Sequence, residues 1–131
     1  GDGIVRNRMQ TVLDGMEVFS FGITKAPESV TKLVHKFNLE MEKIDYFVFH
    51  QANLYMNEII RKKLRIPPEK VPYCLDEYGN TSSASIPLTI CSRIRSSVDN
   101  EFIACGFGVG LSWGSVYFQT NNLILSQILE L

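Results

Sequence analysis

Two short polar segments hold the side chains best suited to chemistry. The first, Phe49-His50-Gln51-Ala52-Asn53, ends an apolar run, and the second, residues 78–85, places Asn80 before a run of small residues. Each lies where a strand is expected to give way to a helix, the edge at which open α/β sheets bind their ligands. One His and one Asn side by side offer two hydrogen-bond donors for a developing oxyanion. No residue stands out as a nucleophile for them to serve.

Each of these residues also has a structural explanation. A single His at the end of a strand often caps the next helix, and Asn80 after Gly79 is typical of a turn. The run Thr81–Ser85 predicts a helix N-cap followed by close packing. The glycines of residues 106–110 do not have the G-x-G-x-x-G spacing of a phosphate loop and precede a strand. They predict a turn with an exposed backbone N–H, which an oxyanion hole also requires.

The cysteines offer an alternative nucleophile for His50. Cys91 falls within an expected helix and Cys105 within an expected strand, so both are interpreted as buried structural residues, while Cys74 leaves a Cys–His hydrolase open. Three cysteines without Cys-x-x-Cys spacing predict neither a disulfide framework nor a metal site. They favour the reducing cytoplasm as the location.

The pattern of apolar residues predicts alternating helices and strands. A helix is expected from Glu17 to about Asn38, with Pro27 causing a kink or starting a second helix. The other expected elements are a strand at 44–49, a helix at 52–64, a strand at 71–75, a helix at 82–95, strands at 102–106 and 111–118, and a helical tail at 123–131. This order predicts a layered α/β fold with a mixed sheet, whose last two strands form an antiparallel pair.

Composition limits the class of protein. The chain has 131 residues, which is long enough for one globular domain with a core. Its content of 45% hydrophobic and 21% charged residues is that of an ordinary globular protein. A net charge of −1 gives no positive field for nucleic acid, and no apolar run approaches a membrane span. The first 15 residues have no signal-peptide pattern and are expected to form a loop or a truncated start.

Three motifs in one order resemble a known family. They are Phe49-His50-Gln51-Ala52-Asn53, the run from Tyr78 to Pro87, and Gly106-Phe107-Gly108-Val109-Gly110-Leu111-Ser112-Trp113-Gly114. Together they resemble the C-terminal half of β-ketoacyl-acyl-carrier-protein synthase III, over roughly residues 10–118. The resemblance implies that residues 1–131 form a C-terminal thiolase-like domain with an extension at 119–131. The fatty-acid-synthesis enzymes of this family are cytoplasmic dimers that work without a resident cofactor.

The resemblance also implies a reaction and a role for each residue. The family condenses an acyl-CoA with malonyl-acyl carrier protein, with loss of carbon dioxide, at a Cys-His-Asn site. His50 and Asn80 match the histidine and asparagine that stabilise the enolate. The backbone N–H of Val109 is expected in the acyl oxyanion hole, and Phe107 and Asn53 are expected near the substrate. The family's cysteine lies in the first half, so this chain alone is expected to be inactive.

One departure from the family concerns its protein partner. Tyr55 stands where many members have an arginine that helps to hold the carrier protein, which leaves Lys62 and Lys63 as candidates for carrier-protein docking. A related thiolase-fold acyltransferase with a CoA-linked acceptor is therefore a second hypothesis. A third is a non-catalytic binding module, which predicts a polar surface. A piece of a larger enzyme instead predicts a large exposed apolar face.

Overall fold

The computed structural model describes residues 14–95, 99–121 and 128–129 of the chain. Three strands form one sheet in the order β1-β2-β3, with β1 parallel to β2 and β2 antiparallel to β3. The elements are α1 (Gly15–Lys36), β1 (Tyr46–Phe49), α2 (Leu54–Lys63), α3 (Leu75–Tyr78), α4 (Ser85–Arg93), β2 (Asn100–Gly108) and β3 (Ser112–Thr120), with single 3-10 turns at Met41–Lys43, Pro68–Lys70 and Ser82–Ala84. The expected mixed α/β architecture with an antiparallel C-terminal pair is confirmed.

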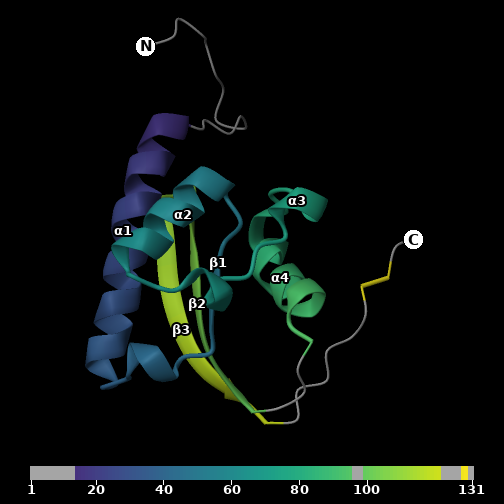
Figure 1. Cartoon of the computed structure of the whole chain (residues 1–131). Helices are drawn as coiled ribbons and strands as arrows, with labels where there is room; N and C mark the ends of the chain where they lie inside the picture. The colour runs from purple at the N-terminus through teal and green to yellow at the C-terminus, as the bar shows by residue number, and fades with distance from the viewer. Residues whose placement is uncertain (1–13, 96–98, 122–127, 130–131) are drawn as a thin grey trace, which may run out of the picture.

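Helices cover both faces of the sheet (Figure 1). Side chains alternate along β2, so Ile103, Cys105 and Phe107 join the main core beneath α1 and α2. Phe102 points the other way and packs with Val48 and with α4 residues in a smaller core. The two cores hold β1 and β2 between layers of helices, which fixes the positions of both strand ends.

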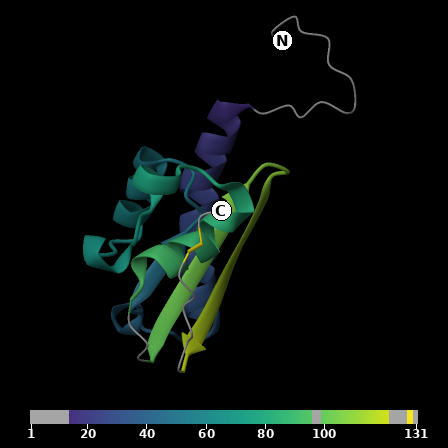
Figure 2. The same ribbon diagram turned by 90° about the vertical axis from the view of Figure 1, so that its right-hand side faces the viewer.

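The register brings the ends of β1 and β2 to one edge. Phe49 pairs with Cys105, and the N–H of His50 donates to the carbonyl oxygen of Cys105 over 2.9 Å. The chain then turns between Gly108 and Ser112, which oppose each other in the antiparallel pair, and Figure 2 shows this hairpin projecting past the end of the sheet. Gly110 has a φ of +123°, a conformation that favours glycine. His50 and the glycine turn are therefore neighbours.

Helix α1 is continuous, so the alternative of a second helix starting at Pro27 is wrong, and a kink at Pro27 stays a prediction. The helix begins at Gly15, with the Asp14 carboxylate accepting the N–H groups of Met16 and Glu17, and runs through Pro27 to Lys36. Proline removes the N–H that would bond the carbonyl of Ile23. Lys63 Nζ donates to that carbonyl over 2.8 Å, so a side chain from α2 replaces the missing donor.

The expected strand at 71–75 is also wrong. Pro72 lacks an N–H, and the backbone around it bonds to side chains and to a 3-10 turn instead of a neighbouring strand. Cys74 N–H donates to Gln51 Oε1 over 3.2 Å, and Tyr73 O accepts from Arg93 Nε over 2.7 Å. Leu75 then starts the single-turn helix α3. The apolar residues of this segment indicate that it is buried, but hydrogen bonds to the side chains of Gln51 and Arg93 fix its backbone conformation.

Other expected elements agree with the structure to within a few residues. The expected helix at 82–95 consists of the 3-10 turn Ser82–Ala84 followed by α4, and the last two strands extend further than expected. Residues 1–13 and most of the tail at 123–131 lie outside the described residues. Among the helices that the structure describes, none has the length and apolar character that a membrane crossing requires.

Candidate functional site

A pocket of about 920 Å³ lies at the edge where β1 and β2 end. The polar segments singled out by the sequence meet there, together with the glycine turn and the beginning of α1. The lining residues are Val18, His50, Ala52, Asn80, Ser82, Ser83, Ser85, Ile86, Gly106, Phe107, Gly108, Val109, Ser112, Trp113 and Gly114. The sheet thus gathers side chains from residues 18 to 114 around one space, at the edge where α/β proteins bind ligands.

His50 is held in place from several directions. Its Nδ1 lies 2.7 Å from Ser85 Oγ, and its ring meets the ring of Phe107 edge-on with centroids 5.5 Å apart. Its carbonyl oxygen accepts from Asn57 Nδ2 over 3.1 Å. Burial lowers the pKa of His50 below its ordinary value, and a hydrogen bond to the Ser82 backbone partly opposes this. At neutral pH the ring is therefore uncharged, with Nε2 as the nitrogen not engaged by Ser85.

Asn80 lies in a loop with unusual backbone angles. Gly79 before it has a φ of +65°, and Ser82 after it has a φ of +56°, which is uncommon for a residue with a side chain. The Oδ1 atom of Asn80 accepts the N–H of Ser82 over 2.9 Å, and its Nδ2 donates to Ala52 O over 3.4 Å. Because the amide oxygen and one N–H are already engaged, the side chain has one N–H left to offer to the pocket.

The glycine turn closes another side of the pocket. Val109 lies at its tip, lines the pocket and is half exposed, while Phe107 is buried with 6% of its surface exposed. Gly22 of α1 lies behind Phe107, and a Cβ atom there would come within 3.0 Å of the Phe107 ring and of Met56 Sδ. A glycine at this position lets α1 approach closely enough to fix Phe107 against His50.

Three residues expected at the site are placed elsewhere. Asn53 is exposed and caps α2, with its Oδ1 accepting the N–H of Met56 over 2.8 Å, and it is not among the pocket-lining residues. Lys62 and Lys63 are exposed in the last turn of α2, and Lys63 is engaged with α1. Their roles in substrate binding and carrier-protein docking remain predictions.

The cysteines do not provide a nucleophile for this pocket. All three lie in the described part of the chain, and none lines the pocket. Cys74 is fully buried, with its Sγ 3.1 Å from Thr89 Oγ1, and burial raises the pKa of Cys105 to about 11. The hydrolase alternative therefore has no thiol in reach of His50. The described residues also contain no cluster of three or more His, Cys, Asp or Glu that could hold a metal ion.

The sequence interpretation missed the residues that support His50. Ser85 was assigned to helix capping and packing, whereas its hydroxyl contacts both the His50 ring and the N–H of Gln51. One signal was present: Ser85 and Thr89 place two hydroxyls one turn apart, on the buried side of an apolar helix. The buried positions of Gln51 and Asn57 carry no comparable signal in the sequence, because both are polar residues at or near the start of the helix expected at 52–64.

Known proteins have similar sequences. The family model described as 3-oxoacyl-[acyl-carrier-protein (ACP)] synthase III C terminal matches residues 34–120. The β-ketoacyl-[acyl-carrier-protein] synthase III of Trichodesmium erythraeum is 44% identical over 112 residues, which cover 83% of this chain and 34% of that protein. The Staphylococcus saprophyticus synthase III is 42% identical over 107 residues, which cover 79% of this chain and 34% of that protein.

Solved structures share the fold. The 3-oxoacyl-(acyl-carrier protein) synthase of Burkholderia xenovorans superposes with a TM-score of 0.84 at 38% identity, over 88% of this chain and 34% of that one. The synthase III of Thermus thermophilus gives a TM-score of 0.77 at 31% identity, over 94% of this chain and 41% of that one. The chain spans about a third of the length of the curated relatives it matches. The expected thiolase-like fold is confirmed, and the chain belongs to the family of 3-oxoacyl-[acyl-carrier-protein] synthase III C-terminal domains.

Proposed function

We propose that this chain supplies the His and Asn of a condensing site that joins an acyl group from acyl-CoA to malonyl-acyl carrier protein. The observation that carries the proposal is that His50 and Asn80 line one pocket with their other polar atoms already engaged. Ser85 occupies Nδ1 of His50, and Ser82 occupies Oδ1 of Asn80. Neutral N–H donors aimed at one space suit the stabilisation of an oxyanion.

The chemistry needs such donors when malonyl loses carbon dioxide. As the bond to the carboxylate breaks, its electron pair moves into the thioester and forms an enolate whose oxygen accepts from His50 and Asn80. The enolate carbon then attacks an acyl thioester on a cysteine, and the thiolate leaves. The backbone N–H of Val109, in the turn beside the pocket, is the proposed donor to the oxyanion of this second step. Phe107 forms the wall next to His50.

The cysteine of this site is proposed to come from another part of the full-length enzyme. Two observations support this. The relatives are about three times as long as the matched region, and this chain exposes large apolar side chains next to the pocket. Val109, Leu111, Trp113 and Val116, on β3 and the turn before it, are 44% to 53% exposed. An apolar face of this kind favours burial against another segment and argues against a free-standing binding module.

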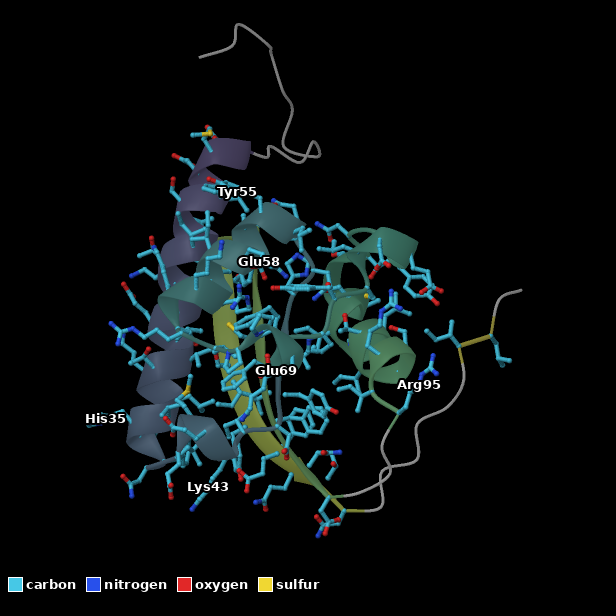
Figure 3. All side chains as sticks on the ribbon, viewed as in Figure 1. His35, Lys43, Tyr55, Glu58, Glu69 and Arg95 are labelled. Carbon is cyan, nitrogen blue, oxygen red and sulfur yellow. The ribbon has the colours of Figure 1, made fainter. Side chains whose placement is uncertain are left out.

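Other features of the proposal follow from the family. The full-length enzyme is proposed to be a cytoplasmic homodimer that draws on thioester substrates and needs no resident cofactor. Asn53 is proposed to meet the pantetheine arm, and Lys62 to meet an acidic carrier protein, since its side chain is exposed at the basic end of α2. Tyr55 is 71% exposed and stacks on Phe19 with centroids 5.9 Å apart (Figure 3 labels Tyr55 on α2). Because it stands where many family members have an arginine that helps to hold the carrier protein, a CoA-linked acceptor is the second candidate.

A chimera tests the proposal. The matching segment of the Trichodesmium erythraeum synthase is replaced by this chain, and condensation product is measured with malonyl-acyl carrier protein and with malonyl-CoA as acceptors. We expect the chimera to form product, with carrier protein as the better acceptor, and this chain alone to form none. The variant Glu40→Gln, at an exposed ion pair, is the matched control for expression and folding. A folded chimera inactive with both acceptors, or an active isolated chain, would contradict the proposal.

A further inference from the structure

Among the described residues, Ser85 has the one hydroxyl group within hydrogen-bond distance of a His50 ring nitrogen. It lies in the first turn of α4 and is completely buried. Its Oγ accepts the backbone N–H of Gln51 over 3.2 Å and lies 2.7 Å from His50 Nδ1. These two partners lie on consecutive residues, immediately after β1. Ser85 therefore connects α4 to the point where the chain leaves the sheet.

The hydrogen positions follow from what each partner can do. A serine hydroxyl has one hydrogen to donate and accepts through two lone pairs. The Gln51 N–H can only donate, so it takes one lone pair of Ser85 Oγ. Within the described ranges, His50 Nδ1 is the remaining partner of this oxygen. A buried hydroxyl hydrogen left without an acceptor is costly, so it points to Nδ1 and that nitrogen is unprotonated.

We propose that Ser85 is a positioning residue that fixes the tautomer of His50, with the proton on Nε2. Because the ring is neutral and Nδ1 is an acceptor, Nε2 must carry the N–H. The opposite tautomer would present a lone pair to the pocket and would repel an oxyanion. Ser85 thus makes His50 a donor without giving it a positive charge. The catalytic consequence rests on the proposed function, whereas the tautomer itself does not.

A second contact keeps the same geometry. Asn57 is fully buried and its Nδ2 donates to the carbonyl oxygen of His50 over 3.1 Å, while the His50 N–H bonds to Cys105 O. Both backbone polar groups of His50 are therefore satisfied by other elements. These bonds hold the backbone of His50, and the contact between Ser85 Oγ and Nδ1 resists rotation of the ring. Ser85 thus engages Nδ1 from α4, the ring also bonds the Ser82 backbone, and Nε2 is the ring nitrogen that Ser85 does not engage.

The imidazole ¹⁵N chemical shifts of this chain, measured by NMR, test the tautomer directly. The chain contains two histidines, and His35 is exposed on α1, so the His50 signals can be assigned with a single His35→Gln variant (Figure 3 labels His35). At neutral pH we expect His50 to be a single tautomer protonated at Nε2. A His50 protonated at Nδ1 in the unmodified chain would overturn the proposal, and this measurement needs no variant of Ser85.

The variant Ser85→Ala tests the cause. We expect its His50 signals to move toward a mixture of the two tautomers, because Nδ1 loses its donor. Thr89→Val is the matched control: it removes another fully buried hydroxyl one turn along α4, which donates to the Ser85 backbone carbonyl, contacts Cys74 Sγ and has no hydrogen bond to His50. Its His50 signals should match those of the unmodified chain. An unchanged tautomer in folded Ser85→Ala would show that Ser85 does not set it.

The chimera described above connects the tautomer to turnover. Ser85→Ala should lower kcat about tenfold or more, the size of effect seen when a group orienting a functional histidine is removed, with KM little changed. Thr89→Val should keep the kcat of the unmodified chimera. A rise in KM without a fall in kcat would contradict a positioning role. If the unmodified chimera is inactive, the proposed function fails while the NMR result still decides the tautomer.

Discussion

Lys63 Nζ donates a hydrogen bond of 2.8 Å to the carbonyl oxygen of Ile23, four residues before Pro27 in α1. A proline in the middle of a helix removes the donor that this carbonyl would otherwise bond. Lys63, in the last turn of α2, supplies this donor from outside α1. This bond ties α1, which lines the pocket through Val18, to α2, which begins at Leu54, four residues after His50.

Replacing Lys63 with Met should lower the free energy of unfolding. The substitution keeps most of the apolar stem and removes the donor, so we expect a loss of about 0.5–1.5 kcal/mol, the range for one hydrogen bond. Urea unfolding followed by circular dichroism measures it. Lys62→Met, the neighbouring exposed lysine, is the control and should change the free energy of unfolding by less than about 0.5 kcal/mol.

A double-mutant cycle with Pro27→Ala identifies the cause of that loss. Alanine restores an N–H for the Ile23 carbonyl, so Lys63→Met should cost less in the Pro27→Ala background than in the unmodified chain. The two substitutions should therefore be non-additive, because the Lys63 ammonium and the restored N–H share one acceptor, the Ile23 carbonyl oxygen. Strict additivity of the two substitutions would mean that Lys63 does not compensate for the proline.

Gly22→Ala should disturb the pocket through Phe107. The added Cβ would lie 3.0 Å from the Phe107 ring and from Met56 Sδ, so the ring must move, and it packs against His50. Overpacking of this kind costs about 1–3 kcal/mol. Thermal unfolding of the chain measures the loss, and kcat of the chimera should fall as well. Gly15→Ala, where a Cβ meets nothing within 4 Å, is the control and should leave both unchanged.

Protonation of Glu58 should lower the free energy of unfolding at acid pH. Its carboxylate accepts from Arg61 and from the Tyr73 hydroxyl, and these bonds, chiefly that of Arg61, lower its pKa to about 2 (Figure 3 labels Glu58 on α2). The depressed pKa gives stability that is present above pH 4.5 and is lost as the pH falls toward 2. Glu58→Gln should remove this contribution, about 1 kcal/mol after solvent screening. Urea unfolding at pH 6 and pH 3 of both proteins measures it, with Glu40→Gln at an exposed pair as control.

His50 should also make stability fall in acid, because the folded chain favours its uncharged ring. Burial lowers its pKa, so protonation favours the unfolded chain, where the pKa is near 6.5. Stability is therefore full above about pH 6.5 and decreases as the pH falls below it. His50→Gln should flatten the slope of unfolding free energy between pH 7 and pH 5, and His35→Gln should keep it. An unchanged slope in His50→Gln would mean that His50 is not the group responsible.

The sequence predicted the parts of the site that depend on strand order. His50, Asn80 and Val109 follow recognisable strand ends or turns, and the parallel pairing of β1 with β2 brings those ends to one edge. It did not predict contacts made across the fold. Ser85 bonds a residue 35 positions away, and Gly22 is needed because of a ring 85 positions away. The spacing of Ser85 and Thr89 indicates a buried face, but nothing local in the chain says which distant residue either Ser85 or Gly22 meets.

The same distinction explains the errors in secondary structure. Pro27 and residues 71–75 were interpreted from local rules, which expect a proline to interrupt a helix and a β-branched apolar run to form a strand. In both places a distant side chain supplies the missing hydrogen bond: Lys63 for α1, and Gln51 and Arg93 for the segment before α3. Local propensity was overridden by tertiary partners that only the folded chain reveals.

The most direct test of this account is the decarboxylation step alone. In the chimera with its cysteine replaced, carbon dioxide release from malonyl-acyl carrier protein should continue, because the proposed function has His50 and Asn80 stabilise the enolate without the thiol. His50→Ala and Asn80→Ala should each slow it by about 100-fold to 1,000-fold, the effect of removing one oxyanion donor. Glu40→Gln should leave the rate unchanged. Release that persists at the full rate in both alanine variants would contradict the assignment of His50 and Asn80 as the enolate-stabilising pair.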